Sequence, residues 1–153
     1  MEKDDLIKKT TKELLEKMGF EGVVIETEKQ ENPPHFIVSI KVDDASRLIG
    51  QSGSNLNDLQ RILRLLAAKK DPDAPPLLLD VNGYREKREQ FLKELSKEIA
   101  EQVVRDKKSV MLQPMSSYER RIIHVELAGR SDVVTESIGE EPERRVIIRP
   151  YQQ

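Results

Sequence analysis

The chain has 153 residues, enough for one ordinary domain or two small ones. Its 37% hydrophobic and 35% charged residues favour small domains with much surface over one large core. The absence of cysteine excludes disulfide scaffolds, thiol nucleophiles and cysteine-based zinc sites. No apolar run reaches membrane-spanning length, and the charged N-terminus lacks the apolar core of a signal peptide, so we expect a cytoplasmic protein.

The net charge of −2 is the sum of two nearly balanced halves. Residues 1–82 hold 12 Lys and Arg against 15 Asp and Glu, whereas residues 83–153 hold 14 against 13. Neither half is strongly basic, so tight nonspecific coating of duplex DNA is not expected. Any nucleic-acid binding is expected to be shape-dependent or single-stranded, and to weaken as the salt concentration rises.

Hydrophobic spacing in the first half predicts the order helix, strand, strand, helix, helix, strand. The expected ranges are a helix at 3–18, strands at 22–29 and 36–42, a short helix at 45–49, a long helix at about 56–69 and a buried strand at 77–81. Residues 30–35 contain two adjacent prolines and are expected to form a turn or loop that includes His35. Residues 71–76 carry three prolines and are expected to be a connector.

Two glycines, Gly50 and Gly53, stand where the short helix meets the long one. Glycine permits turn angles that a side chain forbids, and the start of the next helix presents free N–H groups to a phosphate. The junction is therefore predicted to grip a nucleic-acid backbone. The alternatives are a tight turn in a helical hairpin, or a helix-turn-helix that reads duplex DNA. The apolar stripe of the long helix is expected to be Leu56, Leu59, Leu63 and Leu66, widened by Ile62 and Leu65.

The second half predicts a long charged helix, a short strand, a helix and two strands. The expected ranges are 84–107, 110–112, 114–127, 132–139 and 144–149, with a tail at 151–153. The first of these helices is expected to bridge two domains because its apolar stripe is narrow. That stripe consists of Phe91, Leu92, Leu95, Ile99 and Val103. The second helix either begins at Pro114 or is capped by Ser116 or Ser117.

Arg120 and His124 are four residues apart, so both side chains lie on one face of the helix at 114–127. Arginine supplies a permanent charge and a planar fork for phosphate, and histidine donates to phosphate or stacks on a base. Arg121 is adjacent, and Arg145 and Arg149 share one face of the last strand by parity. Two interpretations remain open: a phosphate-binding face, or a solvated helix face together with strand arginines that provide solubility or pair with Glu140, Glu141 and Glu143.

The element order around Gly50 and Gly53 resembles a type II KH domain, and Arg120-x-x-x-His124 is the signature of the R-3-H domain. This tandem, and the phrase at residues 116–124 (SSYERRIIH), is similar to the bacterial Jag family of SpoIIIJ-associated proteins. The resemblance implies an α+β fold, with a KH domain of order αββααβ at 1–82 and an R-3-H domain at 83–150 that includes the long helix. It also implies that both domains bind single-stranded RNA, and that the protein regulates cell elongation and division. Family members often carry a separate N-terminal Jag domain, which we expect this short chain to lack.

The resemblance also carries over to individual residues. In the KH domain, the expected nucleic-acid-binding residues are Gly50, Gln51, Ser52, Gly53, Arg47, Arg61 and Arg64. In the R-3-H domain, they are Arg120, Arg121, His124, Arg145 and Arg149. The two loop residues of a KH clamp usually include a lysine or arginine, whereas Gln51 and Ser52 donate hydrogen bonds without the strength of a cation. The exposed aromatic candidates for base stacking are Tyr84, Tyr118 and Tyr151, although Tyr118 is expected to pack.

A rival hypothesis is a protein-partner scaffold that pairs through its KH domain with another small KH protein. The uncharged loop and the acidic first half favour this rival. Single-stranded DNA binding by the same face is a third possibility. The sequence has no nucleophile–histidine–carboxylate spacing, Walker loop or paired metal ligands, and His35 has no partner at ligand spacing. We therefore expect no enzyme activity, metal or cofactor.

Overall fold

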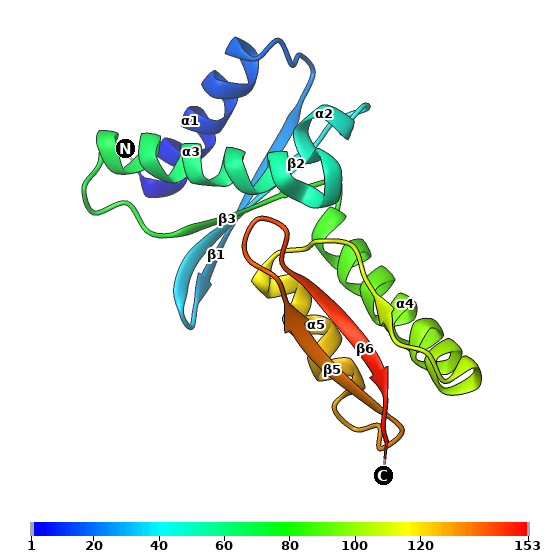
Figure 1. Cartoon of the computed structure of the whole chain (residues 1–153). Helices are drawn as coiled ribbons and strands as arrows, with labels where there is room; N and C mark the ends of the chain where they lie inside the picture. Colours follow the sequence, from blue (N-terminus) through cyan, green and yellow to red (C-terminus); the bar gives the residue numbers. More distant parts are fainter. Residues whose placement is uncertain (1, 153) are drawn as a thin grey trace. The chain divides into compact units, whose positions relative to one another are not determined.

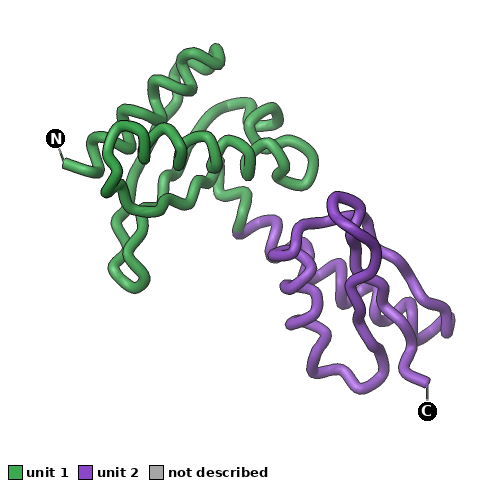
Figure 2. The backbone as a smooth tube through the Cα atoms, turned by 60° about the vertical axis from the view of Figure 1, so that its left-hand side comes forward, with its two compact units in different colours: residues 1–85 green, residues 86–153 purple. Residues whose placement is uncertain are grey.

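The computed structural model describes residues 2–152, which form two compact units, with the boundary between Arg85 and Glu86 (Figure 2). Each unit combines helices with one three-stranded sheet, so the predicted α+β class is confirmed. None of the described helices is both long and apolar enough to span a bilayer. Residue 153, the end of the expected tail, lies outside the described residues.

The first unit has the predicted order of elements (Figure 1). They are α1 (Lys3–Lys17), β1 (Val24–Glu31), β2 (Pro34–Lys41), α2 (Ser46–Ile49), α3 (Ser54–Lys70) and β3 (Leu77–Val81). A 3-10 turn at Gln51–Gly53 separates α2 from α3. The sheet has the order β1-β2-β3, in which β1 is antiparallel to β2 and β2 is parallel to β3. Parallel strands need a crossover connection, and the α2–α3 segment provides it.

The core of the first unit lies between one face of this sheet and helices α1 and α3 (Figure 1). Side chains alternate between the two faces of a strand, so every second residue of β2 and β3 enters the core. Val38 stands opposite Leu79 and Ile40 opposite Val81, and each of the four is at most 1% exposed. This alternation confirms the predicted buried strand at 77–81.

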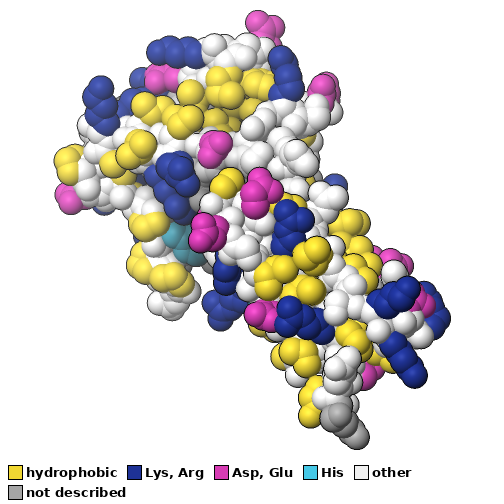
Figure 3. Space-filling view, in the orientation of Figure 1, with side chains coloured by type: hydrophobic (Ala, Val, Ile, Leu, Met, Phe, Trp, Pro, Cys, Tyr) yellow, Lys and Arg dark blue, Asp and Glu magenta, His cyan; other side chains and the backbone are white. Residues whose placement is uncertain are grey.

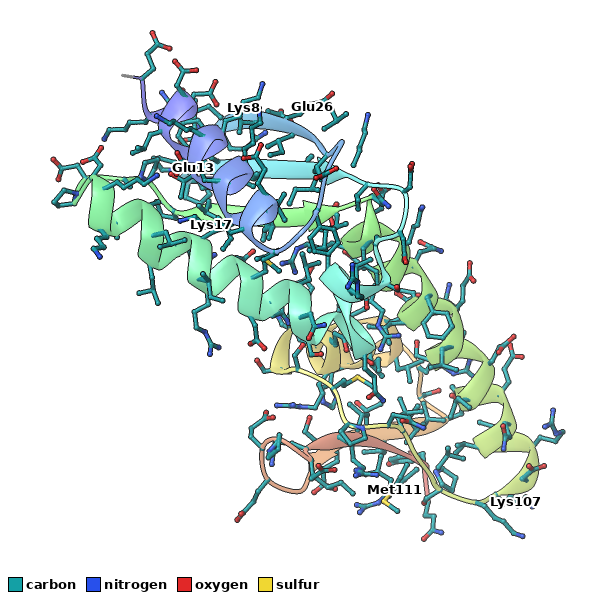
Figure 4. The ribbon with its side chains drawn as sticks, turned by 90° about the horizontal axis from the view of Figure 1, so that it is seen from above. Lys8, Glu13, Lys17, Glu26, Lys107 and Met111 are labelled. Carbon is teal, nitrogen blue, oxygen red and sulfur yellow. The ribbon has the colours of Figure 1, made fainter. Side chains whose placement is uncertain are left out.

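Helix α1 turns one side to the core and the other to solvent. Ile7 and Leu15 are each 1% exposed, whereas Lys17 is exposed and Glu13 lies partly exposed on the side of α1 next to α3 (Figure 4). Lys70, at the end of α3, lies 3.0 Å from Glu13 and joins the two helices by an ion pair. Such partly exposed pairs add little stability, so the helix is held mainly by its apolar side.

The turn expected within residues 30–35 is present, but its predicted bounds are too wide, because the hairpin is tighter than the two prolines suggest. Strand β1 runs to Glu31 and β2 begins at Pro34, which leaves a two-residue turn. His35 therefore belongs to a strand, opposite Gln30, and not to a turn. A proline is tolerated as the first residue of a strand, where its missing N–H weakens the pairing least.

The apolar stripe of α3 is narrower than predicted. Leu56, Leu59 and Leu63 are at most 4% exposed, but Ile62 and Leu65 are 46% and 67% exposed. The expectation that these two residues widen the buried stripe is therefore wrong. The sheet and α1 cover only one side of α3, and residues 62 and 65 project from the uncovered side.

The second unit takes in most of the long helix and a small antiparallel sheet. Its elements are α4 (Tyr84–Asp106), of which the first two residues belong to the first unit, β4 (Val110–Met111), α5 (Ser117–Leu127), β5 (Val133–Ile138) and β6 (Arg145–Pro150). The sheet order is β4-β6-β5. Buried Val103 on α4, Ile123 on α5 and Ile148 on β6 show that both helices share one core with the sheet.

Two details of the helices can be compared with the sequence prediction. Phe91 is 52% exposed, and the buried line of α4 runs instead through Leu92, Ser96, Ala100 and Val103 at steps of three and four. Helix α5 begins at Ser117, so the start at Pro114 is wrong and the alternative cap at Ser116 is confirmed. The Ser116 side chain accepts a hydrogen bond from the Glu119 N–H, as in the capping sequence Ser-x-x-Glu.

Candidate nucleic-acid interface

The turn between α2 and α3 needs glycine at both ends, for different reasons. Gly50 has φ +70° and ψ −175°, a conformation almost confined to glycine, and a Cβ there would lie 2.5 Å from the Asn55 side chain. Gly53 is left-handed, with φ +79°, and a Cβ there would lie 2.9 Å from the Tyr84 ring. Both glycines therefore keep the turn compact.

A hydrogen bond between the flanking helices holds the turn in place, while the side chains at its centre are exposed to solvent. Asn55 Nδ2 donates to the Arg47 carbonyl at 2.9 Å, which ties the start of α3 to α2. Gln51 and Ser52 are exposed, and Ser52 also has positive φ, at 54°. No side chain caps the first turn of α3, although the Ser54 N–H donates to the Gln51 carbonyl.

The three arginines assigned to this site are in different situations. The Arg47 guanidinium lies 5.3 Å from the centroid of the Phe20 ring, beside the turn. Arg61 is exposed, two helical turns into α3. The Arg64 Nε donates to the Leu77 carbonyl at 2.9 Å, which commits that side chain to β3. Of the three arginines, only Arg47 lies within one helical turn of Gly50 in the sequence.

Side chains from α3 and α4 form hydrogen bonds with the backbone at the outer edge of β3. Gln60 Oε1 accepts from the Leu79 N–H at 2.8 Å, and Arg85 Nε donates to the Leu79 carbonyl at 2.7 Å. Arg85 also donates to Gln60 at 3.0 Å. Unpaired strand edges invite pairing with another chain, and these contacts remove that opportunity. Neither Gln60 nor Arg85 was a predicted site residue, because no local pattern relates them to β3.

The second candidate face begins with a buried arginine. Arg120 is only 7% exposed, and its Nη1 donates to the Met115 carbonyl at 2.7 Å and to Glu141 Oε1 at 2.9 Å. These contacts join the start of α5 to the turn between β5 and β6. A phosphate that approached Arg120 would have to replace Glu141.

His124 lies one turn further along α5, between two hydroxyl groups. Its Nδ1 is 2.7 Å from Thr135 Oγ1 and its Nε2 is 2.8 Å from Ser137 Oγ, both on β5. Burial lowers the pKa of His124, and the charge of nearby Arg120 lowers it further. A neutral imidazole has one donor and one acceptor nitrogen, and hydroxyls can satisfy both. The structure therefore brings Arg120 and His124 together, as predicted, but with their polar atoms already bonded.

Arg145 and Arg149 lie on the other face of the sheet from the core, as their parity predicted. Arg149 Nη1 lies 2.6 Å from Glu136 Oε2, and Arg145 Nη2 lies 3.5 Å from Glu143 Oε2. Charges of both signs are also interspersed on the face shown in Figure 3, where the described residues form no continuous basic patch.

Arg121 and the tyrosines complete the predicted set. Arg121 is exposed on α5. The packing expected for Tyr118 is wrong, because this side chain is 63% exposed and lies off the buried face formed by residues 119, 120, 123 and 127. Tyr151 is 56% exposed, as expected, whereas Tyr84 packs partly buried against the core of the first unit.

Comparison with known proteins identifies the relatives of the chain. Residues 90–150 match the R-3-H domain. The chain is 47% identical over 123 residues to the RNA-binding protein KhpB of Clostridium symbiosum. The matched segment covers 80% of this chain and 53% of that protein. The chain is KhpB-like. KhpB of Lactiplantibacillus plantarum is 39% identical over 66% of this chain and 31% of that protein. For KhpB of Bacillus subtilis, the identity is 35% over 78% of this chain and 58% of that protein.

These matches confirm the resemblance to the Jag family. The matched part spans only about one third to three fifths of each KhpB protein's own length. Within the R-3-H domain, the sequence located Arg120 and His124 but not their partners. Glu141, Thr135 and Ser137 come from β5 and the turn after it, and only the tertiary fold brings them to α5.

Proposed function

We propose that the chain binds single-stranded RNA in the cytoplasm, through a KH domain of type II at residues 1–82 and an R-3-H domain at 83–150. The order αββααβ and the relatives' name, RNA-binding protein KhpB, support this assignment. The observation that carries it is the rigid glycine turn with an uncapped α3 behind it. A KH domain grips about four nucleotides at such a turn.

The chemistry of this grip follows from the donors around the turn. The N–H groups in the first turn of α3 that no side chain caps, and the positive end of the helix dipole, would face a phosphate oxygen, while the Gln51 amide and the Ser52 hydroxyl donate from the turn itself. Arg47 adds the nearest positive charge. Because the two loop side chains are neutral, the KH domain binds more weakly than one with a lysine or arginine in its loop.

The R-3-H domain would contribute the second set of contacts. Arg145 and Arg149 would contact phosphate on the exposed face of the sheet. Each would then lose a weak ion pair with a neighbouring carboxylate. Arg120 and His124 act mainly by holding α5 against β5. Two weak modules in one chain raise the overall affinity through effective concentration. By the family resemblance, this binding serves the regulation of cell elongation and division.

The test replaces both loop residues with aspartate, Gln51→Asp together with Ser52→Asp. Two carboxylates at the turn repel phosphate, so RNA affinity should fall at least tenfold while the unfolding midpoint stays the same. Fluorescence anisotropy with a short random-sequence RNA pool measures the affinity. Ser131→Asp with Gln152→Asp adds the same charge at two exposed sites of the second unit and should have a smaller effect. Unchanged affinity in the loop variant would refute the grip, and a single-stranded DNA competitor would show which nucleic acid is preferred.

A second candidate function, pairing with a small KH protein, is favoured by the exposed apolar residues of α3. Ile62 and Leu65 are three residues apart and face away from the core. Light scattering across a concentration series, with and without such a partner, separates the two functions. A complex that disappears in Ile62→Asp with Leu65→Asp, together with no RNA binding by the wild type, would favour pairing alone.

A further inference from the structure

The second unit has a small hollow between α4 and α5, apart from the contacts that Arg120 and His124 make. Its volume is about 240 Å³, and it is lined on α5 by Tyr118, Arg121, Ile122 and Val125. We call this set the α5 outer face. The four residues follow the helical spacing i, i+3, i+4 and i+7, so they form one continuous stripe. The side of α5 that packs on the core is a different one, formed by residues 119, 120, 123 and 127.

The stripe is unusually apolar for an uncovered helix face. Tyr118 is 63% exposed and Val125 is 66% exposed, and Ile122 between them is partly exposed. An exposed aromatic ring and an exposed aliphatic side chain therefore flank Ile122, which also packs against the core. Isolated apolar residues are common on surfaces, but a contiguous group around a hollow is typical of a binding site.

On the α5 outer face, Arg121 supplies a positive charge that is unpaired among the described residues. Among the described residues of the second unit, it is the single arginine without a hydrogen bond, ion pair or ring contact. The other seven bond a carboxylate or a carbonyl; they are Arg88, Arg105, Arg120, Arg130, Arg144, Arg145 and Arg149. An incoming anion can thus reach Arg121 without displacing another partner.

The acidic side chains at the hollow are already neutralised. Glu89 lies 3.2 Å from Lys93, and Glu126 lies 3.1 Å from Lys97. Two carboxylates, two ammonium groups and the Arg121 guanidinium leave a local excess of one positive charge. A purely apolar partner would bury that guanidinium unpaired, which is costly. The complementary ligand is flat, apolar in part and anionic.

We propose that the α5 outer face binds one nucleotide of single-stranded RNA, with the base stacked on Tyr118 and the phosphate at Arg121. Ile122 and Val125 supply the apolar wall beside the base. The hollow is smaller than the roughly 300–1,000 Å³ of pockets for drug-sized ligands, which suits a single base. The inference rests on the proposed RNA binding and adds a contact outside the Arg-x-x-x-His pair.

Affinity measurements on exposed-residue variants of the full chain test this assignment. Tyr118→Leu keeps an apolar side chain but removes the ring, and should weaken binding of the labelled RNA pool about tenfold. Tyr118→Phe keeps the ring and should bind as the wild type does. Arg121→Gln should reduce the slope of log affinity against log salt by about 0.7, the value for one phosphate on a single strand. Arg105→Gln, an exposed arginine paired only with its neighbour Asp106, is the matched control and should leave the slope unchanged.

Tryptophan emission gives a second measurement, because the chain contains no tryptophan. Tyr118→Trp should be quenched when RNA stacks on it, whereas Phe91→Trp, an exposed position on α4 outside the hollow, should not. If the wild type binds RNA and the Gln51–Ser52 variant loses affinity, but the Tyr118 and Arg121 variants bind normally, the nucleotide site is refuted and the proposed function stands. If the wild type binds no RNA, both are refuted.

Discussion

At the scale of single residues, the turn between α2 and α3 restricts most strongly which amino acid can occupy a position. Gly50 combines positive φ with extended ψ, and the Asn55 side chain occupies the space where a Cβ would stand. The same Asn55 amide holds the Arg47 carbonyl, so a shift of Asn55 would loosen the turn as well. The backbone that we assign to phosphate binding is thus held by steric fit at one glycine.

Gly50→Ala should therefore lower both stability and RNA affinity. Strain in this region costs roughly 1–3 kcal/mol, before any cost of moving Asn55. Urea unfolding followed by circular dichroism measures the loss. Gly129→Ala is the matched control, since φ is not positive there and a Cβ meets nothing within 4 Å. A Gly50→Ala variant as stable as the Gly129→Ala variant would contradict the geometry of the turn.

At the scale of elements, His124 joins α5 to β5 through two hydroxyl groups. Because burial lowers its pKa, the folded state binds a proton less readily than the unfolded chain does. The stabilising effect of the neutral ring is complete above the ordinary pKa of about 6.5 and is lost as the pH falls through and below that value.

Wild-type protein should therefore lose more stability between neutral and mildly acidic pH than His124→Asn does. Urea unfolding at a series of pH values measures the difference, and comparison of the two proteins cancels the titration of groups that both share. Parallel pH curves for the two proteins would show that His124 has no part in joining α5 to β5.

The elements also show what can be predicted from sequence. The alternation of Phe36, Val38 and Ile40 predicted a half-covered strand, and the spacing of Arg120 and His124 placed both on one side of α5. The exposure of Ile62 and Tyr118 was not predicted. Periodicity shows that a helix has an apolar side, but it does not show how much of the helix surface the neighbouring elements bury. The Arg120–Glu141 pair depends on the β5–β6 turn folding back to α5, which no local pattern encodes.

At the scale of the whole molecule, the charge distribution sets the expected strength of binding. The net charge is −2, and seven of the eight arginines described in the second unit already bond a carboxylate or a carbonyl. Nonspecific attraction to a polyanion is therefore small. We therefore propose that affinity for RNA comes from a few defined contacts, at the glycine turn and on the R-3-H domain, and from the linkage of two modules in one chain.

The most direct test of this account is an anisotropy titration of the full chain with a short random-sequence RNA pool, at low and at physiological salt. We expect binding in the micromolar range at low salt and weaker binding at physiological salt, with a shallow slope that corresponds to a few phosphate contacts. Absence of binding at both salt concentrations would contradict the assignment of the chain as an RNA-binding protein.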